Sequence, residues 1–147
     1  MDQTTFFSCL EKQNKVKQLF LHCTSPEEKY KKLIEIGQNL TPISPTAKVP
    51  ENAVSGCQSL LYLSACYKDQ KIIFTAASDA LISAGLTALL IMVYSEESPE
   101  VVLKCPPHYL QELGIQASLS PSRSNGLANI YLRMKQEALK FLALNIK

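Results

Sequence analysis

Residues 60–79, LLYLSACYKDQKIIFTAASD, decide the fold predicted for this chain. Two runs rich in aromatic and aliphatic residues, Leu60 to Tyr67 and Lys71 to Ala77, flank the short polar bridge Lys68-Asp69-Gln70. Two such runs joined by a short polar link are typical of an antiparallel β-hairpin. We therefore expect a hairpin here, followed directly by a helix for which Ser78 is the predicted N-cap.

Helix signals precede the hairpin. In the N-terminal region, apolar residues recur at partly helical spacing, and they are Phe6, Phe7, Leu10, Leu19 and Phe20. A second helix is predicted at Ser25-Pro26-Glu27-Glu28, where a capping serine and a proline at the first helical position precede acids that favour the positive helix end. Residues 41–50 carry three prolines and are expected to form an irregular connection.

Helix signals also follow the hairpin. The run from Ala80 to Tyr94 is apolar nearly all round, which predicts a helix at the centre of the core. A short helix is expected at 107–113, and a last helix begins at the cap Ser120 with Pro121 and continues to the C-terminus. The prediction is an α+β fold, in which a small antiparallel sheet of about three strands packs against helices in a single domain, residues 1–147.

Composition narrows the class of protein. The chain has 147 residues, of which 46% are hydrophobic and 19% charged, with a net charge of +2. This balance is that of a globular protein without the basic stripe that nucleic-acid binding requires. The apolar run at 80–94 has 15 residues, fewer than the roughly 20 that a membrane span needs. No signal peptide precedes it, so we expect a cytoplasmic protein without membrane contact.

Five cysteines occur without any CxxC pair, and they are Cys9, Cys23, Cys57, Cys66 and Cys105. Structural zinc sites usually take ligands from closely spaced Cys and His pairs, and the chain has only His22 and His108 in addition. We therefore expect no disulfide framework, no metal and no bound cofactor. Cys66 is expected in the core, Cys9 and Cys23 in helix interiors or at helix ends, and Cys105 in a loop.

Cys57 has a different setting from the other cysteines. Its neighbours Gly56 and Gln58 pack poorly, but glycine allows a sharp bend or a close approach by another molecule. Nearby N–H and amide donors favour the thiolate, which is the reactive form of cysteine. The adjacent sequence offers no lysine, arginine or histidine to activate it further. Cys57 is thus the predicted reactive residue, although a buried structural thiol is the alternative.

Three stretches resemble the SufE family of sulfur-acceptor proteins: NAVSGCQSLLYL at 52–63, SDALISAGLTALL at 78–90 and LSPSRSNGLANI at 119–130. The resemblance implies a SufE/IscU-like fold and a role in iron–sulfur cluster assembly. It implies that Cys57 carries a persulfide, accepting sulfur from a pyridoxal-phosphate cysteine desulfurase and stimulating that enzyme. The pyridoxal phosphate belongs to the desulfurase. SufB-like scaffold proteins are the implied recipients of the sulfur.

The resemblance also implies which residues face the desulfurase. They are Gly56, Gln58, Asp79, Arg123, Asn125 and Gly126. Arg123 has an alternative reading, because an arginine in the first turn of a helix opposes the dipole and is often paired with a carboxylate such as Asp79.

Three other functions are compatible with parts of the sequence. An IscU/SufU-type metal-binding scaffold would need several clustered cysteine ligands, drawn from Cys57, Cys66 and Cys105. A thiol hydrolase would pair a cysteine with His22 or His108. An adaptor would bind its partner without chemistry, and replacing Cys57 by serine would then have no effect.

Overall fold

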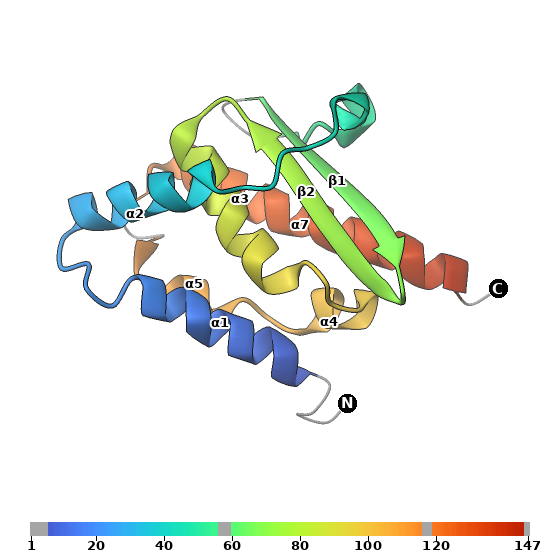
Figure 1. Cartoon of the computed structure of the whole chain (residues 1–147), viewed down its shortest axis with the longest axis horizontal. Helices are drawn as coiled ribbons and strands as arrows, with labels where there is room; N and C mark the ends of the chain where they lie inside the picture. Colours follow the sequence, from blue (N-terminus) through green and yellow to red (C-terminus); the bar gives the residue numbers. More distant parts are fainter. Residues whose placement is uncertain (1–5, 56–59, 116–118, 146–147) are drawn as a thin grey trace.

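The computed structural model describes residues 6–55, 60–115 and 119–145 (Figure 1). The helices are α1 (Phe7–Leu19), α2 (Pro26–Gln38), α3 (Leu81–Tyr94), α4 (Pro99–Lys104), α5 (His108–Glu112) and α7 (Pro121–Asn145). The strands are β1 (Leu61–Lys68) and β2 (Lys71–Ser78), and the 3-10 turns Pro45–Ala47 and Pro50–Asn52 precede them. Helix α3 lies at the centre, in contact with α1, α2, α7 and β2. The predicted α+β class, with an antiparallel sheet packed against helices, is confirmed.

The hairpin forms where it was predicted. Its register pairs Leu61 with Ser78 at the open end and Lys68 with Lys71 beside the turn. Asp69 and Gln70 form the turn with φ values of 52° and 66°, as the type I′ turns that fit the twist of a hairpin require. Within the described residues the sheet has two strands, and the segment before β1 adds an isolated bridge from Ala53 to Tyr62.

Alternation along β1 decides which side chains enter the core. Leu61 and Leu63 are buried, whereas Cys66 lies on the opposite face and is exposed. The expectation that Cys66 is a core residue was therefore wrong. Successive side chains of a strand point to opposite faces, so Cys66 shares its face with Tyr62 rather than with the two buried leucines.

Helix α3 is buried along most of its length, as predicted. The prediction of Ser78 as its N-cap was wrong. Its N-cap is Ala80, which makes no side-chain capping bond. Ser78 remains the last residue of β2, and its hydroxyl accepts a hydrogen bond from the amide of Ala80 at 3.2 Å. The strand therefore includes Ser78, and the helix starts at Leu81, two residues later than a cap at Ser78 would place it.

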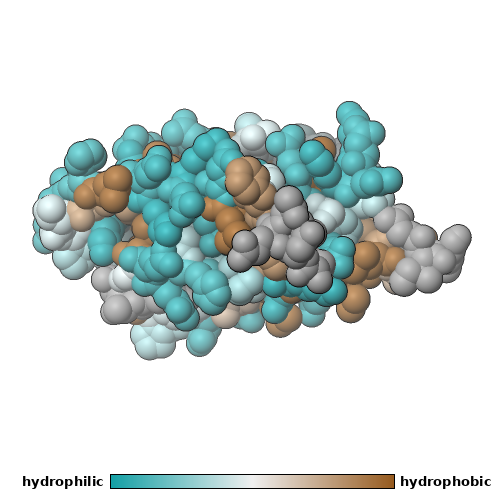
Figure 2. Space-filling model, turned by 90° about the horizontal axis from the view of Figure 1, so that it is seen from below, coloured by the Kyte–Doolittle hydropathy of each residue, from teal (hydrophilic) through white to brown (hydrophobic). Residues whose placement is uncertain are grey.

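The N-terminal helix buries a different face from the one predicted. Its buried residues are Cys9, Gln13 and Val16, while Phe7 is 65% exposed. Gln13 can be buried because its side-chain amide donates to the carbonyl of Pro106 at 3.1 Å. Figure 2 shows the molecule from below, the side on which α1 lies in Figure 1, and hydrophilic residues cover most of this face.

A largely buried ion pair fixes α1 to the end of the hairpin. Lys12 Nζ lies 2.6 Å from Glu97 Oε2, and the hydroxyl of Ser8 donates to the same oxygen at 2.8 Å. The amide of Ile72 in β2 donates to the carbonyl of Glu97 at 2.9 Å. The same residue thus connects α1 with β2.

The second half of the chain contains a helix that was not predicted. Helix α4 starts with Ser98 as N-cap, whose hydroxyl accepts from the amide of Val101 at 3.3 Å. The same Ser-Pro-Glu signal predicted α2 correctly, where Ser25 accepts from the amide of Glu28 at 3.2 Å. The expected start of α7 is also confirmed, because Ser120 accepts from the amide of Arg123 at 3.3 Å.

Candidate functional site

The segments that precede and follow the predicted reactive cysteine, residues 53–54 and 61–62, are paired with each other. The amide of Val54 donates to the carbonyl of Leu61 at 2.9 Å, and Ala53 bridges Tyr62 in the antiparallel direction. These contacts close the base of a six-residue connection, 55–60, that contains Cys57. Residues 56–59, including Gly56, Cys57 and Gln58 of the predicted site, lie outside the described residues.

Asp79 lies beside this base. It lines a hollow of about 200 Å³ together with Lys48, Leu60, Tyr62, Ala77 and Ser78. Leu60 follows Cys57 by three residues, and Ser78 pairs with Leu61, so the hollow adjoins the end of the connection. The hollow presents one cation and one carboxylate, both on exposed residues.

Sequence reasoning missed Lys48 because it lies in the proline-rich connection at 41–50. No basic residue is adjacent to Cys57 in the sequence, but the fold places Lys48 in the same hollow as Leu60. A nearby ammonium group favours a thiolate over a thiol. The fold thus supplies a cation at the edge of the connection.

Arg123 and Gly126 line a second, smaller hollow at the start of α7. They share it with Ser83 and Leu86 of α3. Because α3 begins two residues after Asp79, both hollows adjoin its first turns. Asn125 is exposed on the same turn of α7. Four of the predicted partner-facing residues, Asp79, Arg123, Asn125 and Gly126, therefore belong to the segments around the start of α3 and the start of α7.

The alternative pairing of Arg123 does not form. Among the residues that the structure describes, no ion pair joins Arg123 to Asp79. Both residues are exposed. Leu60 and Leu81 are 54% and 58% exposed. Leu60 lines the hollow that contains Asp79, and Leu81 follows Asp79 by two residues in the chain.

Two of the other cysteines are unsuited to nucleophilic chemistry. Cys9 and Cys105 are fully buried. Cys105 lies in the connection between α4 and α5, as predicted, but its thiol is enclosed in the core. Burial raises the pKa of the Cys9 thiol far above its ordinary value, and the neighbouring Cys105 raises it further. Burial likewise raises the pKa of Cys105. Both therefore stay protonated at neutral pH, whereas attack requires the thiolate.

The remaining described cysteines are Cys23 and Cys66. Cys23 is half-buried, and its thiol lies 3.7 Å from the carbonyl of Glu28. Cys66 is exposed near the closed end of the hairpin, away from the base at Val54 and Leu61. Within the described ranges, no group of three or more His, Cys, Asp or Glu side chains could hold a metal ion. His22 and His108 are both exposed.

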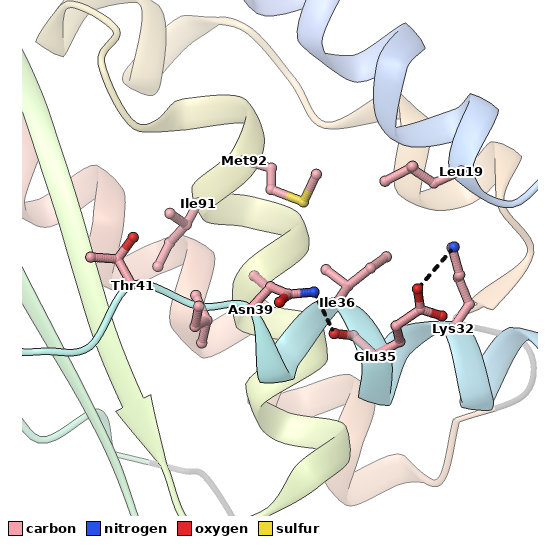
Figure 3. A pocket seen from close by; sticks show the side chains of 10 residues that line it. Leu19, Lys32, Glu35, Ile36, Asn39, Thr41, Ile91 and Met92 are labelled. Carbon is pink, nitrogen blue, oxygen red and sulfur yellow. Dashed lines mark hydrogen bonds and ion pairs between the residues drawn. The ribbon is translucent and has the colours of Figure 1, made fainter.

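A further pocket of about 340 Å³ lies between α1, α2 and α3 (Figure 3). Leu19, Ile36, Ile91 and Met92 contribute apolar groups to it, and the ion pair of Lys32 with Glu35, at 3.5 Å, lies at one side. Its lining contains neither a thiol nor an imidazole. It therefore offers an apolar surface but no nucleophile.

The profile of the SufE family, described as an Fe-S metabolism associated domain, matches residues 14–138. The chain belongs to the SufE family. The SufE match extends over both sides of the Cys57 connection and over the first turns of α3 and α7. SufE membership gives the chain a role in iron–sulfur metabolism and implies a cysteine desulfurase as its partner.

Individual SufE relatives agree with this assignment. The chain is 35% identical to an uncharacterized SufE-like protein of Synechocystis over 127 residues, which are 86% of this chain and 80% of the relative. It is 36% identical over 129 residues to SufE-like protein 1, chloroplastic/mitochondrial, of Arabidopsis thaliana, covering 87% of this chain and 35% of that longer protein.

A solved structure shares the SufE fold seen here. The solution structure of a hypothetical protein from Thermus thermophilus superposes with a TM-score of 0.74 and 25% sequence identity. The match covers 90% of this chain and 96% of the other. In the part of the chain that the structure describes, no helix is both long and apolar enough to cross a membrane.

Proposed function

We propose that this chain is a sulfur acceptor that takes persulfide sulfur from a cysteine desulfurase onto Cys57. The observation that carries the proposal is the SufE match across the GCQS segment, which the fold closes at its base through Val54 and Leu61. The charges of Lys48 and Asp79 adjoin this base. Cys9 and Cys105 are excluded as acceptors by their burial.

The transfer is a thiol–disulfide exchange that requires no external oxidant. The Cys57 thiolate attacks the outer sulfur of the desulfurase persulfide and forms a new S–S bond. The original S–S bond breaks, and the desulfurase cysteine leaves as a thiolate. The persulfide proton remains with the transferred sulfur or passes to solvent. The acceptor needs no metal and no cofactor of its own for this step, and the pyridoxal phosphate belongs to the desulfurase.

The proposed desulfurase-facing surface comprises the Cys57 connection with Gly56 and Gln58, the exposed residues Asp79, Arg123 and Asn125, and the newly located Lys48. Gly126 is buried beneath this turn of α7 and would shape the surface rather than face the partner. Removing sulfur from the desulfurase would also speed its turnover. We propose that the chain acts as a single SufE-like domain, residues 1–147, and that a SufB-like scaffold receives the sulfur. A cytoplasmic location without nucleic-acid or membrane partners stays a prediction.

The test is mass spectrometry after incubation with an active desulfurase and cysteine. The wild-type protein should gain one or more sulfur atoms of about 32 Da each, located at Cys57. Cys57→Ser should gain none and should lose desulfurase stimulation. Cys66→Ser is the matched control, because it removes an exposed thiol elsewhere and should load normally. Sulfur on Cys66 alone, or stimulation that survives Cys57→Ser, would contradict the proposal.

A further inference from the structure

Arg133 of α7 reaches the segment that leads into the Cys57 connection. Its Nη1 donates to the carbonyl of Ala53 at 3.1 Å, and its Nη2 donates to the carbonyl of Glu51. Its Nε lies 3.2 Å from Oε1 of Glu137, one helical turn further along α7. The arginine and glutamate side chains are only 18% and 16% exposed. Three guanidinium nitrogens therefore have acceptors in a largely shielded position.

The segment held by Arg133 has little regular structure to fix it. It consists of the 3-10 turn Pro50–Asn52 and the residues that follow. Its links to the hairpin are the isolated bridge from Ala53 to Tyr62 and the hydrogen bond from Val54 to Leu61. Both links lie on the hairpin side of the segment, whereas Arg133 connects the segment to α7.

The chemistry of the contact requires arginine. A guanidinium presents several donors in a planar fork and can bond two carbonyls and a carboxylate together, whereas a lysine ammonium is a compact point charge on a flexible stem. Hydrogen bonds made by a charged donor are also stronger than neutral ones. The guanidinium projects from a well-packed part of α7, because the neighbouring residues Ile130, Met134 and Ala138 are buried in the core.

We infer that Arg133 is a positioning residue that fixes the base of the Cys57 connection against α7. This inference rests on the proposed sulfur transfer, because its purpose is to present Cys57 in one place to the desulfurase. Arg133 acts through Glu51 and Ala53, whose carbonyls it holds. Small displacements of a reacting group can slow a reaction about a hundredfold, so a fixed base is a direct advantage for transfer.

Hydrogen exchange tests the structural half of this inference. In Arg133→Gln, the amide of Val54 should exchange about ten times faster than in the wild type, since a hydrogen-bonded charged group next to it is lost. The amide of Ile72, bonded to Glu97 at the other end of the hairpin, should exchange at an unchanged rate. Arg133→Lys should give an intermediate rate at Val54. Equal acceleration at both amides would indicate general destabilisation and overturn the inference.

Sulfur transfer tests the functional half. Per folded molecule and at saturating desulfurase, Arg133→Gln should load Cys57 about tenfold more slowly, with partial recovery in Arg133→Lys. Lys140→Gln is the control, because Lys140 also pairs with Glu137, whereas among the described residues the side chain that bonds Glu51 and Ala53 is that of Arg133. If Arg133→Gln loads at the wild-type rate while the wild type is active, the inference is wrong. If the wild type accepts no sulfur at all, the proposed function fails instead.

Discussion

Gly37 and Gly85 bring the backbones of α2 and α3 into direct contact. A Cβ atom added at Gly37 would lie 2.6 Å from the backbone nitrogen of Gly85, and one added at Gly85 would overlap the carbonyl of Leu33. Real Cβ contacts are essentially never that short. The contact sets how closely α2 packs on α3, whose first turns adjoin Asp79 and Arg123.

Gly85→Ala should therefore destabilise the fold. The added methyl meets backbone atoms on another helix, which cannot move aside as a flexible side chain could. Overpacking costs typically about 1–3 kcal/mol, and we expect the upper part of this range in the free energy of unfolding, measured with urea. Gln38→Ala, at the exposed position next to Gly37, is the control and should change stability by less than about 0.5 kcal/mol. A loss below about 1 kcal/mol in Gly85→Ala would show that the helices can separate easily.

Sequence predicted the elements whose signals are local. Ser25 and Ser120 cap their helices as expected, because a capping serine bonds an amide three residues away. The hairpin also depends on nearby residues alone. Gly56, Cys57 and Gln58 were predicted from sequence and stay predictions, since they lie outside the described residues.

The errors concern contacts between distant segments. Gln13 is buried because Pro106, far along the chain, offers it a carbonyl, and no pattern within α1 reveals that partner. Lys48 adjoins the Cys57 connection only because the proline-rich segment folds back past Leu60. Two signals were available but misread: alternation along β1 exposes Cys66, and Ser98 with Pro99 starts a helix.

Arg123→Gln should weaken sulfur transfer without weakening the fold. Its side chain is exposed in the first turn of α7. A positive charge there lies near the positive end of the helix dipole and destabilises the helix by about 0.3–1 kcal/mol. Removing the charge should leave the free energy of unfolding unchanged or slightly higher. We expect the desulfurase concentration for half-maximal loading of Cys57 to rise by roughly fivefold, a change of about 1 kcal/mol in binding.

The control for Arg123 is Lys68→Gln, which removes a charge beside the turn of the hairpin. Lys68 is at the opposite end of β1 from Leu61, about 20 Å away at the usual rise of a strand. Its substitution should leave half-maximal loading unchanged. An equal effect of both substitutions would mean that the overall charge, rather than the position of Arg123, governs the encounter.

Stability should fall at alkaline pH because Cys9 and Cys105 are buried as neutral thiols. Burial raises the pKa of both above the ordinary value of 9.0. Above pH 9 the unfolded chain loses these protons while the folded chain keeps them, so the folded state binds more protons and the free energy of unfolding decreases as the pH rises. The Cys9 thiol contributes up to about 1.4 kcal/mol per pH unit once the unfolded form is ionised, and Cys105 acts in the same direction.

Urea titrations between pH 7.5 and pH 10 measure this dependence. The wild type should hold a constant stability up to about pH 8 and then lose it progressively. Cys9→Ala removes one of the two thiols, so its stability should decline less steeply with pH even though the variant is less stable at pH 7.5 because of the lost packing. The comparison of slopes separates titration from packing, since a cavity lowers stability at every pH equally. Parallel slopes for the two proteins would mean that the Cys9 thiol ionises alike in the folded and unfolded chain.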